Sequence, residues 1–329
     1  MLWLLCSARN LVQPKRRGYS PRDALRSPKM SGLQYKGINL PPLNPGQSGP
    51  VAFVKHVFDY AYEDALLERV KSEGFNSVRL CMNVLTANDP GTLQTMKSLV
   101  QKVGGHALVC MVDTDTGSKD SKDDHGNGVV NDASEMADAW KKVHAVFGDL
   151  DGVLYEIFNE PFGYKDANKY MSEMAGIISA AGLPQDRCMI NGMGYASDLA
   201  SVVKWGWKGL LAWHLYPNWL PQGQWTQENY SNMIQKHLNG LTGRVFITEF
   251  GVHLNKPVDY DHYLKEGSTD DAGSVNTVRG LHDALLFYAK KGAPVRGAYC
   301  WHGAPNADSH DFFHGANAAG AKKVKYLLS

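Results

Sequence analysis

The sequence predicts a single closed (β/α)8 barrel of the TIM type, with the active site at the carboxyl ends of its strands. From residue 34 onward, short apolar runs rich in β-branched residues alternate with amphipathic runs of helical periodicity. The apolar runs are nearly continuous, which is typical of parallel strands covered on both faces. Eight such repeats in about 300 residues suit a closed barrel better than an open sheet.

The elements follow one another in a regular order. The eight predicted strands are Gln34–Leu40, Asn76–Met82, His106–Val112, Val153–Asn159, Arg187–Gly192, Leu210–Tyr216, Arg244–Phe250 and Val295–Trp301. Helical spacing of apolar residues predicts helices near 62–73, 93–103, 136–147, 167–181, 195–205, 226–239, 278–288 and 316–328. Four of the five cysteines lie inside predicted strands and none forms a CxxC pair, so we expect buried thiols without disulfides or zinc.

Composition indicates a globular protein with a distinct leader. The 329 residues include 34 basic and 33 acidic ones, so a chain-wide basic surface for nucleic acid is not expected. No apolar run approaches the length of a membrane-spanning helix. Residues 1–30 carry seven Lys or Arg and one acid, Asp23. We expect a basic leader or disordered extension over 1–30 and one barrel domain over 31–329, with secretion or an organelle both open as destinations.

Polar residues close several predicted strands, at the end of the barrel where chemistry is found. The candidates are Arg79, Asp113 and Asp115, Asn159 and Glu160, His214 and Tyr216, Glu249, and Trp301. Buried carboxylates are costly unless they are paired or functional, so Glu160 and Glu249 are read either as catalytic groups or as members of structural salt bridges. Two carboxylates facing each other across a cleft are the minimum requirement for glycoside hydrolysis.

Three weaker signals leave alternatives open. Trp213, Trp219, Trp225 and Trp301 could stack on sugar rings or pack in the core. The acidic loop 113–124 begins D-x-D-x-G, but its glycine and its last acid do not fit a calcium loop, so a solvated loop is favoured. Residues 192–194, Gly-Met-Gly, lack the third glycine of a nucleotide site, so a tight turn is favoured. We expect no cofactor and no metal.

Five motifs resemble those of glycoside hydrolase family 5, the cellulase-like family of clan A. Residues 155–161, Tyr-Glu-Ile-Phe-Asn-Glu-Pro, resemble its Asn-Glu-Pro signature, and residues 74–80 resemble its second-strand motif with Arg79. Residues 213–216 resemble the His-x-Tyr pair of the sixth strand, and 247–251 the seventh-strand motif around Glu249. Trp301 stands in the place of the eighth-strand tryptophan. The motifs fall in family order over residues 34–303.

The resemblance implies a retaining mechanism by double displacement. It assigns Glu160 as the general acid/base, Glu249 as the nucleophile and Asn159 as the ligand of the sugar 2-hydroxyl. It assigns Arg79 and Tyr216 as supports of Glu249, and His214 as the support of the acid/base. Trp301 is assigned as the floor of the subsite before the cleavage point. One departure affects that subsite, because Asp115 stands where the family usually has a histidine.

The resemblance implies a β-linked oligo- or polysaccharide as partner, with endo-β-1,4-glucanase activity or action on another β-linked glucan. A β-mannanase, or a hydrolase of β-glucosides on lipids and small aglycones, is the alternative within the enzyme class. A carbohydrate-binding protein that has lost catalysis on the same scaffold is the alternative from another class. We expect a monomer.

Overall fold

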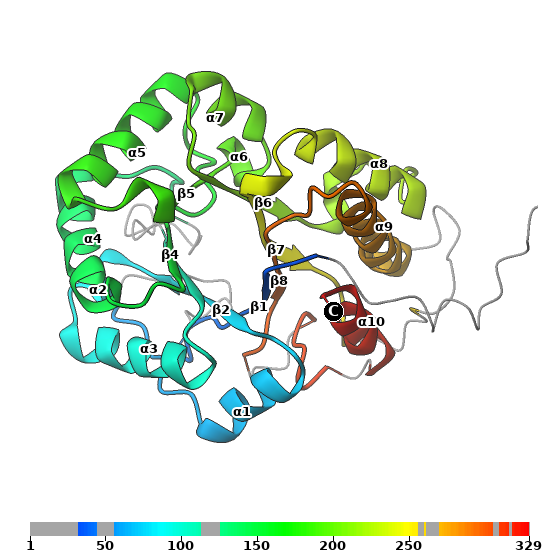
Figure 1. Cartoon of the computed structure of the whole chain (residues 1–329), viewed down its shortest axis with the longest axis horizontal. Helices are drawn as coiled ribbons and strands as arrows, with labels where there is room; N and C mark the ends of the chain where they lie inside the picture. The colour runs from blue at the N-terminus through cyan, green and yellow to red at the C-terminus, as the bar shows by residue number, and fades with distance from the viewer. Residues whose placement is uncertain are drawn as a thin grey trace, which may run out of the picture.

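The computed structural model describes residues 32–44, 56–112, 126–255, 260, 270–304, 309–315 and 318–328. Eight parallel strands close into a barrel in the order β1 to β8, and helices surround them (Figure 1). The predicted (β/α)8 barrel is therefore confirmed. The leader 1–30 and the acidic loop 113–124, including Asp113 and Asp115, lie outside the described residues.

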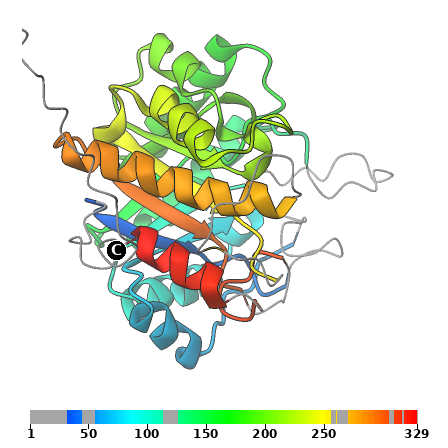
Figure 2. The ribbon, with the colours of Figure 1, turned by 90° about the vertical axis from the view of Figure 1, so that its right-hand side faces the viewer.

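All eight strands lie within one or two residues of the predicted starts. They are β1 (Tyr35–Asn39), β2 (Ser77–Met82), β3 (Ala107–Met111), β4 (Val153–Glu156), β5 (Cys188–Asn191), β6 (Leu210–Leu215), β7 (Val245–Gly251) and β8 (Gly297–Trp301). The longer helices are α1 (Asp64–Ser72), α3 (Pro90–Lys102), α4 (Ala133–Phe147), α5 (Ala167–Ala181), α7 (Leu199–Trp205), α8 (Gln227–Leu238), α9 (Asp270–Lys290) and α10 (Ala318–Leu328). Figure 2 shows α9 and α10 side by side on the outside of the barrel.

Short elements account for most differences from the predicted pattern. Two single-turn helices, α2 (Val84–Ala87) and α6 (Met193–Ala196), and three 3₁₀ turns, η1 (Gln185–Arg187), η2 (Pro217–Trp219) and η3 (Thr242–Arg244), were not predicted. The helix predicted over 195–205 is wrong in its first part. Non-helical backbone dihedrals at Gly194 and Tyr195 interrupt the helix there. The helix α7 starts only after Asp198, whose side chain caps its N-terminus by accepting a hydrogen bond from the backbone N–H of Ser201.

The predicted fourth strand was too long at its carboxyl end. β4 ends at Glu156, three residues before the predicted end. Ile157 still donates its backbone N–H to Met189 on β5, whereas Asn159 donates to Met111 on β3, on the other side of β4. This switch of partners ends the regular ladder and raises the next residue, Glu160, over the barrel mouth.

The lower part of the barrel interior is filled by one apolar layer. Its members are Tyr35, Leu108, Leu154, Met189, Leu210, Ala212, Phe246 and Tyr299. The Tyr299 ring crosses β1 at Gly37, where a Cβ would lie 1.9 Å from Tyr299 Cδ1, and its hydroxyl pairs with Ser77 Oγ at 2.7 Å. Only glycine leaves room for this ring, so the apolar layer forms a floor beneath the polar residues above it.

Two further expectations concern the described residues. Cys81, Cys110, Cys188 and Cys300 are buried free thiols, as predicted. In the part of the chain that the structure describes, every helix is too short or too polar to cross a membrane.

Candidate active site

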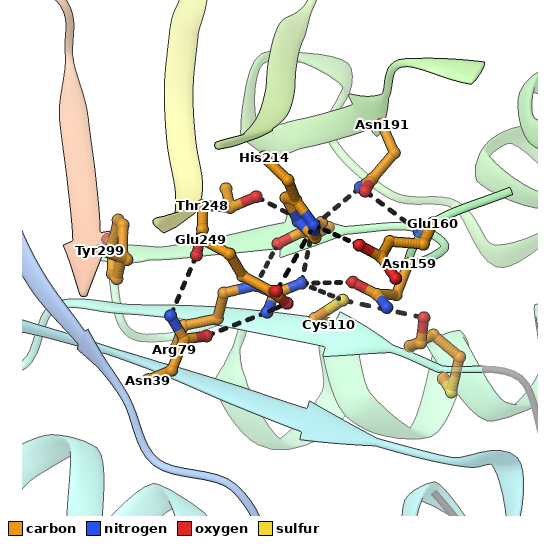
Figure 3. Close-up of polar contacts among 12 residues, drawn as sticks. Asn39, Arg79, Cys110, Asn159, Glu160, Asn191, His214, Thr248, Glu249 and Tyr299 are labelled. Carbon is orange, nitrogen blue, oxygen red and sulfur yellow. Dashed lines mark hydrogen bonds and ion pairs between the residues drawn. The ribbon is translucent and has the colours of Figure 1, made fainter. Parts of the chain in front are cut away.

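Arg79 is the centre of a polar cluster above the apolar floor (Figure 3). Its fully buried guanidinium donates to Glu156 through Nε at 2.7 Å and Nη2 at 2.9 Å, and to Glu249 Oε1 through Nη1 at 2.6 Å. The other acceptors come from three further segments and are Asn39 Oδ1 at 2.9 Å, Cys110 Sγ at 3.2 Å and Asn159 Oδ1 at 2.7 Å. A buried cation is costly unless it is paired, and two carboxylates supply the opposite charge here.

Glu249 on β7 is held by a donor at each carboxylate oxygen. Oε1 accepts from Arg79, and Oε2 accepts from the hydroxyl of Tyr216 at 2.6 Å. The side chain is only 7% exposed. Burial, together with the charges of Glu249 and Glu160, raises the pKa of the Tyr216 phenol well above its usual range, so the hydroxyl stays protonated and donates. These two bonds fix the orientation of the Glu249 carboxylate.

Glu160 follows β4 in a different setting. Its backbone has a φ of +44°, in the left-handed region, which costs a non-glycine residue roughly 1–2 kcal/mol. Backbone contacts on both sides hold this conformation, since Glu160 N–H donates to Asn191 Oδ1 at 3.2 Å and Phe162 N–H donates to Glu160 O at 2.7 Å. The side chain is 25% exposed. Strained backbone of this kind is typical of functional sites.

His214 on β6 lies between the two glutamates. Its Nδ1 is 2.8 Å from Glu160 Oε1 and 3.5 Å from Glu249 Oε2. Burial lowers the pKa of the imidazole, but the charge of Glu249 and the hydrogen bond with Glu160 outweigh it and raise the pKa above the ordinary 6.5. A register shift after Trp213 pairs His214 with Glu249 rather than Thr248, so an irregularity in the sheet brings these two residues together.

Glu156 and Asn191 connect the two halves of the cluster. The fully buried Glu156 carboxylate accepts from Arg79, from Asn191 Nδ2 at 2.7 Å and from Thr248 Oγ1 at 3.4 Å. Burial alone would raise the pKa of Glu156, but the charge and hydrogen bonds of Arg79 lower it below the ordinary 4.5. Because Asn191 also accepts from the backbone of Glu160, one amide links the Arg79 pair to Glu160.

Glu160, His214 and Glu249 each place one oxygen or nitrogen so that all three atoms lie within 4.8 Å of one another. Their spacing alone would allow a metal ion. The guanidinium of Arg79, 2.6 Å from Glu249, is a competing cation that would repel one. The expected absence of a metal stays a prediction.

The predicted mouth tryptophans differ in their surroundings. Trp301, at the end of β8, is 3% exposed, and its peptide bond to His302 is cis. Of the two alternatives left open for Trp213, packing in the core is the one observed, because its buried ring stacks on His237 of α8 with centroids 5.6 Å apart. Side chains alternate along a strand, so Trp213 points outward where His214 points inward. Trp219 packs against the hydrophobic core.

A cavity of about 210 Å³ lies against Tyr216. Its other lining residues come from the loops after β6, β7 and β8, and they are Pro217, Asn218, Trp225, His253 and His310. Of the four tryptophans, Trp225 is the one that lines this cavity, and its Nε1 donates to Leu220 O at 2.9 Å.

Asp115 lies outside the described residues, so its expected effect on the sugar subsite stays a prediction.

Comparisons with known proteins agree with this geometry. The family model described as cellulase (glycosyl hydrolase family 5) matches residues 42–288. The chain belongs to this family. No curated protein sequence matches the chain.

Similar solved structures share the fold at low sequence identity. The Pseudomonas stutzeri endoglucanase Cel5A, in complex with cellobiose, is 14% identical, with a TM-score of 0.64 over 91% of this chain and 93% of its own. An endocellulase from Pyrococcus horikoshii, in complex with cellotetraose, is 16% identical, with a TM-score of 0.64 over 90% and 93%. An endo-β-1,4-glucanase from Xanthomonas axonopodis pv. citri is 15% identical, with a TM-score of 0.60 over 90% and 100%.

In this family 5 chain, the structure brings together most of the predicted site residues. Hydrogen bonds join Arg79, Asn159, Tyr216 and Glu249 into one group and His214 to Glu160 in another. The two groups meet where His214 Nδ1 lies 3.5 Å from Glu249 Oε2. Sequence reasoning missed Glu156 and Asn191. Glu156 could have been found from its place in an apolar strand, because a carboxylate buried there needs a partner. Asn191 ends β5, as the predicted site residues end their own strands.

Proposed function

We propose that this family 5 glycoside hydrolase is a retaining β-glycosidase that cleaves β-linked glucan in the manner of an endo-β-1,4-glucanase. The spacing of its two carboxylates carries the proposal. Oxygen atoms of Glu160 and Glu249 lie within 4.8 Å of each other. Retaining glycosidases hold their carboxyl groups about 5–5.5 Å apart, whereas inverting enzymes keep about 6.5–9.5 Å to admit a water molecule.

In the first step, Glu249 attacks the anomeric carbon while the bond from that carbon to the leaving oxygen breaks. Glu160 donates its proton to this oxygen, and a covalent glycosyl-enzyme forms on Glu249. In the second step, Glu160 removes a proton from water, whose oxygen attacks the anomeric carbon and releases Glu249. The two inversions together retain the β configuration.

The surrounding contacts support this division of roles. Arg79 and Tyr216 each donate to one oxygen of Glu249 and hold its carboxylate in one orientation, as a nucleophile requires. Asn159 Oδ1 accepts a hydrogen bond from Arg79, and the Asn159 amide nitrogen would donate to the sugar 2-hydroxyl. The hydrogen bond between His214 Nδ1 and Glu160 Oε1, 2.8 Å long, holds the acid/base in place. Trp301 would form the floor beneath the sugar that becomes attached to Glu249.

The choice of glucan rests on similarity and not on a contact. The similar structures are named as endoglucanases or an endocellulase, and two of them hold cellobiose or cellotetraose. A β-mannanase, or a hydrolase of glycolipid or aryl β-glucosides, would use the same two glutamates. A catalytically inactive sugar-binding protein is disfavoured, because both glutamates are present with their partners in place.

A substrate panel tests the proposal. Soluble β-1,4-glucan, mixed-linkage glucan, mannan, xylan, a glucosylated lipid and aryl β-glycosides are incubated with the wild type, Glu160→Gln and Glu249→Gln. We expect the highest kcat/KM on a β-1,4-linked glucan, and loss of activity on that glucan in both variants. Preference for mannan or for the glycolipid would replace glucan as the substrate. Binding without turnover by the wild type would favour the sugar-binding alternative.

A further inference from the structure

Tyr195 is the most exposed large hydrophobic side chain in the described part of the chain. Its side chain is 55% exposed, compared with 40% for Val57 and 37% for Trp205. It lies in α6, directly after β5, at the end of the barrel that carries the glutamates. A single exposed aromatic residue is ordinary on a protein surface, so the position of Tyr195 and the support beneath its ring are what distinguish it.

A second ring supports Tyr195 from behind. Phe162 stacks on it with ring centroids 5.1 Å apart and an angle of 14° between the planes. Phe162 is itself packed on Gly128, where a Cβ would lie 2.7 Å from the ring, and the neighbouring Gly163 N–H donates to Gly128 O at 3.1 Å. One face of the tyrosine therefore rests on a fixed ring, and the other face is open to solvent.

The backbone around Tyr195 is also held in place. Gly194 and Ala196 on either side have positive φ angles of +69° and +56°. Met193 and Asp198 exchange backbone hydrogen bonds of 3.1 Å across the turn, and Ala196 is fully buried. A non-glycine residue adopts this conformation only where its surroundings impose it. The turn therefore presents the ring in a fixed direction.

This pair of rings lies on the Glu160 side of the site. Phe162 is two residues after Glu160 and donates its backbone N–H to Glu160 O. Asn191, which accepts from the backbone of Glu160, ends the strand that leads into the Tyr195 turn. In the proposed reaction Glu160 protonates the departing oxygen, so the departing part of the substrate lies on the same side as these rings.

We propose that Tyr195, backed by Phe162, is a stacking platform for the departing sugar of a β-linked glycan chain. This inference rests on the proposed function and refines it, since an open aromatic face suits the apolar face of a pyranose unit. The same platform holds an incoming sugar in the second step. There the acceptor hydroxyl forms the new bond to the anomeric carbon, the bond to Glu249 breaks, and Glu160 takes the hydroxyl proton.

Two substrates separate this role from a general effect on catalysis. Cellopentaose needs both a bound departing sugar and a proton from Glu160. Dinitrophenyl β-cellobioside has a leaving group that carries no sugar and needs no proton. For Tyr195→Ala we expect kcat/KM to fall about tenfold on cellopentaose, from the loss of one stacked ring, and to stay within about twofold on the aryl substrate. The ratio of transglycosylation to hydrolysis with added cellobiose falls in parallel.

Matched variants complete the test. Tyr195→Phe keeps the ring and should behave as the wild type. Trp205→Ala removes an exposed aromatic residue at the far end of α7, and should leave both substrates unaffected. An unchanged cellopentaose rate in Tyr195→Ala, equal losses on both substrates, or the same loss in Trp205→Ala would each overturn the inference. If the wild type still cleaves the aryl substrate, the proposed function survives that result; if it cleaves neither substrate, the proposed function itself fails.

Discussion

The two glutamates of this site are held in opposite ways. Glu249 lies inside strand β7, is 7% exposed, and accepts one hydrogen bond from Arg79 and one from Tyr216. Glu160 lies beyond the end of its strand with a left-handed backbone, is 25% exposed, and its side chain contacts His214. The first belongs to the rigid interior of the barrel, and the second to its rim.

This difference matches what each proposed role requires. A nucleophile keeps one charge and one position until it forms a bond, so fixed donors and burial suit it. A general acid/base gains and loses a proton in every cycle, so it needs access to solvent and to two reaction partners. Asn191 joins the two regions, because it contacts Glu156 in the interior and the backbone of Glu160 at the rim.

The largest expected effect separates the two glutamates by substrate. Glu249→Gln should lower kcat/KM by more than about 10⁴-fold on every substrate, because no covalent intermediate can form. Glu160→Gln should lower it by about 10²–10⁴-fold on cello-oligosaccharides, but only slightly on dinitrophenyl β-cellobioside. Steady-state kinetics on both substrates measures this. Equal losses in the two variants on the aryl substrate would remove the distinction between the roles.

The next effect concerns stability in the interior. Arg79→Met leaves Glu156 and Glu249 buried without their cation, and breaking a buried pair in this way costs about 3–5 kcal/mol. Urea unfolding monitored by fluorescence gives the free energy of unfolding. Lys97→Met, which removes a surface pair with Asp149, is the control and should change stability little. A similar small change in Arg79→Met would show that the interior is not held by this cation.

A smaller effect tests one contact of Glu249. Tyr216→Phe removes a single hydrogen bond to a charged group, which is worth roughly 1.5–3 kcal/mol and corresponds to about 10- to 100-fold in kcat/KM. Tyr288→Phe, whose hydroxyl donates to Gln235 O between the outer helices, is the control and should keep full activity. If both variants behave alike, the Tyr216 hydroxyl does not support Glu249.

The smallest effect is on the pH dependence of stability. The lowered pKa of Glu156 means that its contribution is complete above about pH 4.5 and is lost as the pH falls through the folded value. The raised pKa of His214 acts in the other direction, since its contribution is complete below about pH 6.5 and is lost as the pH rises through the folded value.

Melting temperatures across pH 3–9 for the wild type, Glu156→Gln and His214→Gln check this. Glu156→Gln should flatten the acid side of the profile, and His214→Gln the neutral to alkaline side. The opposite assignment, or parallel profiles in all three proteins, would contradict these shifts.

Much of the barrel and its chemistry could be predicted because both depend on local signals. Apolar runs of strand length, separated by amphipathic helices, predict the alternation that closes the barrel. Carboxylates at strand ends, such as Glu160 and Glu249, stand out because burial disfavours them. Arg79 and His214 stand out for the same reason, as polar residues in apolar predicted strands at that end of the barrel.

The remainder depends on contacts between distant segments. The roles of Glu156 and Asn191 come from hydrogen bonds across 77 and 35 residues of sequence. The bulge that pairs His214 with Glu249 leaves no trace in the apolar pattern, because Trp213 looks equally suited to either face. The turn around Tyr195 was predicted from its glycines as a tight turn, but its stacking on Phe162 arises only from the fold.

The configuration of the first product tests the central claim most directly. A wild-type digest of a β-1,4-linked oligosaccharide is followed by proton NMR from the first minutes, before mutarotation mixes the anomers. Double displacement through Glu249 predicts that the β-anomer appears first and the α-anomer grows in later. Initial release of the α-anomer would show a single inversion, and would contradict the assignment of Glu249 as a nucleophile.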